Sequence, residues 1–330
     1  MKRFQSILLA PLLLLLASGS ALLAFSYEDP ADYPLMGDWQ GEWVNAKKGH
    51  EKAHPAIAAQ LLPVNGGTHY RVVILPELYN RAEPYLIAEV PATDQRVAVD
   101  EGGYEVVFSG TEVRGRAKLH GDSTEFVLRK VALDSPTVGL QPPAGATVLF
   151  DGSDYSSWMH REAKPVTWDI VGSAMQTVTK HNQANRAQGL GGDLKSREKF
   201  GSMRLHLEFR YPVEAGKSGQ GRSNSGLFLG AIGEVQILNS YTTPNYWNEC
   251  GAFYKRIPAK VDAAGPPLEW QAYDVDIDLQ VNGKAVVTVQ LNGRILHHQM
   301  EMPCAAKELS IGLQDHINIL QFRNIWLVEK

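Results

Sequence analysis

SMRLHLEFRY, residues 202 to 211, decides the fold class of this chain. Its residues alternate: Leu205 and Leu207 fall on one face of an extended segment, and His206 and Glu208 fall on the other. A period of two is typical of a β-strand with one buried face and one polar face. This stretch therefore predicts a strand that covers a hydrophobic core.

Short alternating runs of the same kind follow one another to the C-terminus, and no amphipathic helix interrupts them. They include TWDIV (167–171), GEVQIL (233–238), WQAYDVDIDL (270–279), VQLNG (289–293) and LQFRNIWLV (320–328). Asn292-Gly293 between two such runs indicates a tight hairpin, because both residues tolerate positive φ. Residues 147–330 are therefore predicted to form an all-β, two-sheet antiparallel sandwich.

The N-terminal part has its own set of strands. HYRVVIL (69–75), GYEVVFSG (103–110) and STEFVLRKV (123–131) predict a small antiparallel meander or barrel over residues 35–133. Trp39 and Trp43 are interpreted as core aromatics of its first strand. Residues 134–146 are rich in Pro and Gly and lack an apolar face, so they predict an interdomain linker.

The first 24 residues have the pattern of a secretory signal peptide, with Lys2 and Arg3 before a short apolar run and cleavage after Ala21 or Ala24. The run is shorter than the about 20 apolar residues that span a bilayer. We therefore expect an exported protein, periplasmic or extracellular, with no stable membrane insertion after cleavage. Cys250 and Cys304 would meet an oxidising compartment, where a disulfide and two free thiols are equal alternatives.

Composition and motifs exclude several functions. The formal charge is −4 with no basic stripe, which argues against a nucleic-acid partner. The sequence has no Cys-x-x-Cys, HExxH, G-x-S-x-G or Walker motif, so zinc, serine-hydrolase and nucleotide sites lack support and no organic cofactor is expected.

Several strands offer polar side chains that alternate with core positions, and we expect them to share one surface. On a face that only meets solvent, Thr, Ser and Lys would be more usual than these polar side chains. Small glycines beside the polar side chains leave room for a ligand. The candidates are Glu208, Arg210, Asn224, Glu234, Gln236, Gln314 and His316.

The motifs together resemble a known family, the 3-keto-disaccharide hydrolases, formerly a domain of unknown function. They are LFDGSDYSSW (149–158), GRSNSGLFL (221–229), GEVQIL, CGAFYKRIP (250–258), PPLEWQAYDV (266–275), GLQDH (312–316) and FRNIWL (322–327). The resemblance covers residues 147–330 and implies a concanavalin-like jelly roll. The N-terminal domain looks like an accessory domain that accompanies this family.

The resemblance also implies the chemistry. A ketone at C3 of a glycoside acidifies the C2 hydrogen, so a base can form an enolate that expels the C1 substituent, and water then adds to the enone. Glu234, His316 and, third, Glu208 are candidates for the base. Arg210, or a divalent metal held by Glu234, His316 and neighbouring oxygens, would stabilise the enolate. Tyr254 would protonate the leaving oxygen.

Other residues are assigned to an oligosaccharide or glycoside substrate. Asn224, Gln236 and Gln314 would orient hydroxyl groups, and Trp270 would offer an aromatic surface. Arg323 is either a ligand contact or a structural ion-pair partner.

Three alternatives remain at this point. A noncatalytic carbohydrate-binding module would use exposed aromatic platforms and no group of shifted pKa. A retaining glycosidase would need a second carboxylate near Glu234 on its strand, where Gln236 and Leu238 stand instead. A structural surface protein is the least favoured, because the sequence has no repeats.

Overall fold

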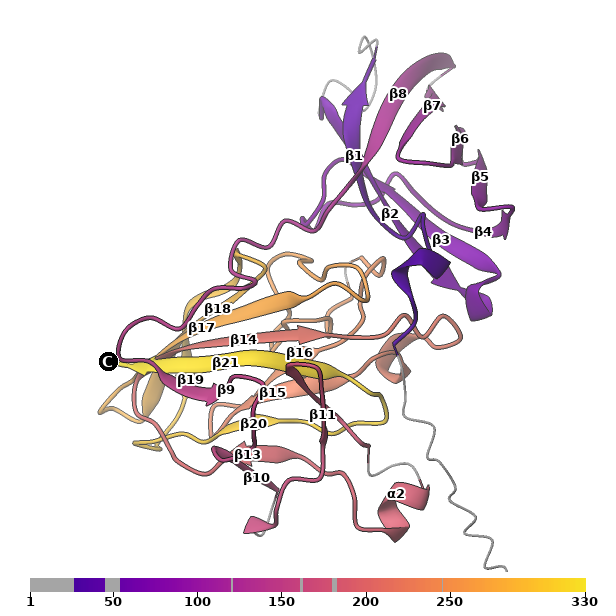
Figure 1. The fold of residues 1–330 in the computed structure, drawn as a ribbon. Coiled ribbons are helices and arrows are strands. Elements are labelled where there is room, and N and C mark those ends of the chain that lie inside the picture. Colours follow the sequence, from indigo (N-terminus) through magenta and orange to yellow (C-terminus); the bar gives the residue numbers. More distant parts are fainter. Residues whose placement is uncertain (1–26, 45–53, 120, 161–162, 180–182, 245) are drawn as a thin grey trace, which may run out of the picture.

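The computed structural model describes residues 27–44, 54–119, 121–160, 163–179, 183–244 and 246–330 (Figure 1). The expected signal peptide, residues 1–24, lies outside the described residues. Among the described residues, no helix is both long enough and apolar enough to span a membrane.

The N-terminal strands form a closed antiparallel barrel in the order β1 to β8. Trp39 lies fully buried inside it with its ring edge against Phe108, and Trp43 packs in the same way on Phe126, which confirms both as core aromatics. The barrel strands are β1 (Gly37–Trp43), β2 (Ala56–Val64), β3 (His69–Leu75), β4 (Leu86–Thr93), β5 (Arg96–Glu101), β6 (Tyr104–Phe108), β7 (Glu112–Leu119) and β8 (Asp122–Val131).

The C-terminal strands form two antiparallel sheets, as the alternation predicts. The smaller sheet has the order β10-β13-β20-β15-β16, from strands β10 (Trp158–His160), β13 (Leu194–Ser196), β20 (Ile311–Leu313), β15 (Ser225–Leu229) and β16 (Glu234–Ile237). The larger sheet has the order β11-β12-β21-β14-β17-β18-β19, with β9 also paired to β21. Its strands are β9 (Thr147–Phe150), β11 (Asp169–Val171), β12 (Ala174–Gln176), β14 (Met203–Arg210), β17 (Gln271–Leu279), β18 (Lys284–Leu291), β19 (Arg294–Pro303) and β21 (Gln321–Glu329).

Helical structure in the described residues is limited to short segments: α2 (Gln183–Ala187) and the 3₁₀ turns η1 (Pro30–Asp32), η2 (Asn65–Gly67) and η4 (Gly219–Gly221). The hairpin between β18 and β19 is confirmed: Asn292 and Gly293 have φ of 52° and 74°. Cys250 and Cys304 are both buried free thiols, so the disulfide alternative is not realised in this structure.

The two halves contact each other through buried polar groups. The Tyr241 hydroxyl of the sandwich donates a hydrogen bond of 2.9 Å to Asp38 Oδ1 of the barrel, and Arg81 of the barrel pairs with Glu249. Burial raises the pKa of the Asp38 carboxyl, although Tyr79 and Tyr241 hydrogen-bond to it. Since Val213, Tyr241 and other sandwich residues also join the barrel's apolar cluster, the halves are packed rather than merely tethered.

The connecting segment 134–146 crosses the outer face of the larger sheet (Figure 1). Gly139 N donates to Glu208 Oε1 at 2.6 Å, and Asn324 Nδ2 donates to the Leu140 carbonyl at 2.9 Å. Several of its backbone groups therefore belong to the sandwich's hydrogen-bond network.

Candidate functional site

The two sheets pack face to face, so their outer faces point in opposite directions. Leu205 and Leu207 of β14 and Val235 and Ile237 of β16 enter one shared core. The residues that alternate with them on β14 therefore lie on one outer side of the sandwich, and those on β16 lie on the other. The expectation of a single surface shared by all the predicted side chains is wrong for this reason.

Glu234 begins β16, the edge strand of the smaller sheet, on its outer face. It pairs with Phe228 of β15 across the ladder, and the neighbouring pair on the same face is Gln236 with Gly226. A Cβ at Gly226 would lie 2.1 Å from the Glu234 carboxylate, so this carboxylate rests on the bare backbone of β15. Glycine is therefore required at residue 226 to let the carboxylate lie flat against the sheet.

The Glu234 carboxyl titrates near neutrality. Burial, and secondly the negative charge of Asp193, raise its pKa to about 7. Within the described residues, no hydrogen bond stabilises its ionised form. A carboxyl group in this condition is present in both protonation states at neutral pH, which is the property of a general base.

Amide side chains surround this carboxylate. Gln314 N donates to the Gly226 carbonyl at 2.9 Å, which places Gln314 beside Gly226 on the side away from Gln236. Gln236 Nε2 and Asn224 Nδ2 both donate to Gln220 Oε1, each at 3.0 Å. The side-chain oxygens of Gln236 and Gln314 are buried and accept no hydrogen bond from the described residues. A hydroxyl group of a ligand that reached these acceptors would supply the hydrogen bond that each lacks.

Tyr254 and His316 lie on segments next to this face. Tyr254 N donates to the Glu234 carbonyl at 3.0 Å, and the neighbouring Phe253 bridges to Val235 in the core, so Tyr254 lies beside Glu234 by alternation. His316 follows Gln314 by two residues, and its carbonyl accepts a 2.5 Å hydrogen bond from the Thr179 hydroxyl.

Glu208, Arg210, Arg323 and Trp270 belong to the opposite side of the sandwich. Glu208 is fully buried, and hydrogen bonds from His206, Asn324, Gly139 and Arg323 outweigh its burial and lower its pKa to about 2. Arg323 donates to Glu208 at 2.7 Å and lies 4.0 Å above the Trp270 ring, and Arg210 covers the same ring at 4.9 Å. These contacts favour the structural ion-pair role of Arg323, which was one of its two predicted roles. The predicted roles of Glu208 and Arg210 beside Glu234 are corrected, because both are remote from it.

The predicted metal ligands do not gather into a binding site. Among the described residues, no three or more His, Cys, Asp or Glu side chains lie closely enough together to hold a metal ion. Glu234 and His316 alone do not make up the ligand set that a divalent cation usually needs in proteins. The described His, Cys, Asp and Glu side chains therefore do not form a metal site by themselves.

Two residues of this face were missed by the sequence reasoning. Asp193 directly precedes Leu194, which pairs with Leu313 of β20. The Oδ1 atom of Asp193 accepts a hydrogen bond from Asp315 N at 3.0 Å. Gln220 lies in the 3₁₀ turn η4 and connects Asn224 to Gln236. Neither belongs to a run with a readable period. The GGD turn before the short strand β13 is the only sequence signal for Asp193.

Comparison with known proteins identifies the family of this chain. The 3-keto-alpha-glucoside-1,2-lyase-like domain matches residues 145–328, more than half of the chain. The chain belongs to this family. Membership confirms the resemblance inferred from the motifs, and it places the chain among carbohydrate-active enzymes with a jelly-roll sandwich.

One similar solved structure agrees with this family, and a second is more distant. A protein of Parabacteroides distasonis, provisionally named a glycosyl hydrolase, is 31% identical with a TM-score of 0.50, and the match covers 57% of this chain and 85% of that one. A second protein of the same organism and provisional name is 17% identical, with a TM-score of 0.41 and coverage of 56% and 94%. No curated protein matches the chain.

Proposed function

We propose that this protein cleaves glycosides that carry a ketone at C3, by removal of the C2 proton, elimination of the C1 substituent and addition of water. The observation that carries the proposal is the Glu234 carboxylate, which has a pKa of about 7 and lies on bare backbone between acceptor amides. A hydrolase that works through an oxocarbenium ion would need a pair of carboxylates at fixed separation, whereas elimination needs one tuned base.

The first step is proton transfer. Ionised Glu234 takes the C2 hydrogen as a proton, and the electron pair of the C2–H bond forms the enolate of the C3 ketone. Lys195 pairs with Gly312 on the same outer face, and we assign it as the cation that stabilises the enolate oxygen in place of Arg210.

The second step is loss of the C1 substituent. The enolate re-forms the ketone, the C1–C2 double bond appears, and the C1–O bond breaks with its electron pair on the leaving oxygen. Tyr254, beside Glu234, donates the proton to that oxygen. Water then adds its oxygen to C1 and gives a proton to the Tyr254 phenolate, while protonated Glu234 returns a proton to C2, so the net change is hydrolysis and both side chains regain their starting states.

The amides give the substrate its orientation. Gln236 and Gln314 present acceptor oxygens on either side of Gly226, where sugar hydroxyls would donate to them. Gln220 holds the Gln236 amide by its nitrogen, which leaves the Gln236 oxygen to accept from the ligand.

The test is release of the aglycone from a chemically 3-oxidised glucoside and from its unoxidised parent, with and without a chelator. We expect the wild-type chain to cleave only the oxidised substrate, with incorporation of solvent deuterium at C2, and the Glu234→Gln variant to lose this activity. Glu301→Gln changes an exposed carboxylate of the larger sheet and is the matched control.

Three results contradict the proposal. Cleavage of the unoxidised parent at an equal rate would indicate ordinary glycosidase chemistry. Cleavage without deuterium at C2, together with an unchanged rate for a substrate deuterated at C2, would exclude proton abstraction there. Binding of both sugars without turnover of either would favour the carbohydrate-binding module instead. Loss of activity with the chelator would assign part of the catalysis to a metal.

A further inference from the structure

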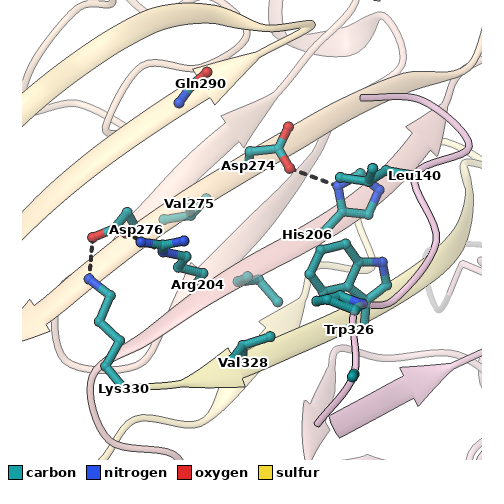
Figure 2. A pocket seen from close by; sticks show the side chains of 13 residues that line it. Leu140, Arg204, His206, Asp274, Val275, Asp276, Gln290, Trp326, Val328 and Lys330 are labelled. Carbon is teal, nitrogen blue, oxygen red and sulfur yellow. Dashed lines mark hydrogen bonds and ion pairs between the residues drawn. The ribbon is translucent and has the colours of Figure 1, made fainter. Parts of the chain in front are cut away.

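A cavity of about 650 Å³ lies on the outer face of the larger sheet, on the side of the sandwich away from Glu234. Its lining includes Arg204 and His206 of β14, Asp274 of β17, Gln290 of β18 and Trp326 of β21, as Figure 2 shows. Pro143 and other residues of the connecting segment also line it. The volume is within the range of about 300–1,000 Å³ that small-molecule sites have.

The charges of the lining are compensated within the protein. Lys330 Nζ contacts Asp276 at 2.5 Å and Asp278 at 2.8 Å, and Arg204 contacts Asp276 at 3.3 Å. His206 lies between Asp274 and Glu208. An ionic ligand would have to break these pairs, so the cavity favours a neutral one.

Two polar atoms of the lining residues have no partner. Asp274 Oδ1 binds His206 at 2.8 Å, but Asp274 Oδ2 is buried without a hydrogen bond from the described residues, and the same holds for Trp326 Nε1. One atom is an acceptor and the other a donor, and the Gln290 amide offers both functions. Such atoms in a native structure call for an explanation, of which a missing water or ligand is one.

A ligand for this lining must be neutral, must donate and accept hydrogen bonds, and must have apolar surface to place against Pro143, Leu140 and Val328. A pyranose ring has these properties, since its hydroxyl groups do both and its C–H faces are apolar. The chain's membership of a carbohydrate-active family agrees with this class of ligand.

We propose that this cavity is a second saccharide site, which binds a neutral pyranoside and takes no part in bond cleavage. Asp274 accepts from one hydroxyl group, and Gln290 contacts a neighbouring one. Because the site lies on the far side of the sandwich from Glu234, it can hold one part of a carbohydrate surface or chain while another part is processed.

The experiment titrates the full chain with unoxidised methyl α-glucoside and follows the indole N–H resonances by ¹H–¹⁵N NMR. The Trp326 resonance is assigned by its loss in Trp326→Phe. We expect a saturable shift of this resonance, at least about fivefold weaker binding in Gln290→Ala, and unchanged binding in Gln314→Ala, which alters the other face. Gln290 makes no side-chain hydrogen bond with the described residues, so its removal leaves the fold intact.

Two outcomes overturn the proposal. The first is no shift of the Trp326 resonance up to about 50 mM sugar, where even a millimolar site is filled. The second is a shift with an apparent Kd that neither Gln290→Ala nor Asp274→Asn changes. Glu234→Gln is expected to bind the glucoside in this cavity as the wild type does, so failure of the proposed reaction would leave this test unaffected.

Discussion

Gly226 controls where the Glu234 carboxylate lies. In Gly226→Ala the new methyl group would occupy the place of Glu234 Oε1, and the side chain would swing away from the sheet because its end is free to move. We expect kcat/KM on a 3-keto glucoside to fall on the order of 100-fold, as for other misplaced catalytic groups, with little loss of stability. Gly216→Ala, with open space around the new methyl, is the control. Unchanged kcat/KM would mean that Glu234 is not the base.

Asp193 adjusts the acidity of Glu234. Since the base must be ionised, activity is expected to rise with pH through about 7 in the wild type. Asp193→Asn removes one of the two causes of the raised pKa, so the rising limb of the pH–rate profile moves to lower pH. The limb still lies above the pH at which an ordinary carboxyl group titrates, because burial continues to raise the pKa of Glu234. The amide oxygen introduced by this substitution can still accept a hydrogen bond from Asp315 N. A limb that stays in place would contradict this assignment.

At the scale of elements, strand β14 carries a stabilising network rather than catalytic groups. Its Glu208 has a pKa lowered to about 2, so the network adds stability above the ordinary carboxyl pKa and loses it as pH falls toward 2. We expect Glu208→Gln to lower the free energy of unfolding by about 2 to 3 kcal/mol at pH 7, because Arg323 is left without its partner. Urea unfolding measures this, and the difference from wild type should shrink below pH 4.

The Glu208→Gln variant also tests whether the outer face of the larger sheet takes part in catalysis. Glu208→Gln should keep the wild-type kcat/KM at temperatures where it is folded. A selective loss of activity would return Glu208 to the list of candidate bases.

Strand β14 also shows what the sequence could predict. The alternation of Leu205 and Leu207 with His206 and Glu208 correctly separates core from outer positions, and the hairpin at Asn292 is equally local. The period cannot say which sheet a strand joins, because that depends on long-range pairing: β14 pairs with β17 and β21, whereas β16 pairs with β15. Glu234, Gln236 and Gln314 were therefore grouped correctly, but Glu208 and Arg210 were added to the wrong face.

At the scale of the whole molecule, Asp38 links barrel and sandwich. Asp38→Ala removes the acceptor for the Tyr241 and Tyr79 hydroxyls at a fully buried position, and we expect a loss of about 2 kcal/mol of stability. Asp38→Asn should cost less, because the amide oxygen still accepts and the raised pKa shows that burial disfavours the charge. Calorimetry should show one shared unfolding transition in the wild type. Two separate wild-type transitions would mean that the contact does not couple the halves.

The connecting segment has a practical consequence for anyone who would divide this chain. Stretches rich in proline and glycine are usual sites of proteolytic nicking, because a protease must bind them as an extended strand. Here the Gly139 N–H and the Leu140 carbonyl already have partners on the larger sheet. Digestion is therefore expected to spare this connector, and a fragment that starts at residue 145, where the family match begins, would leave Glu208 without its backbone donor. The two halves are better expressed and stored as a single piece.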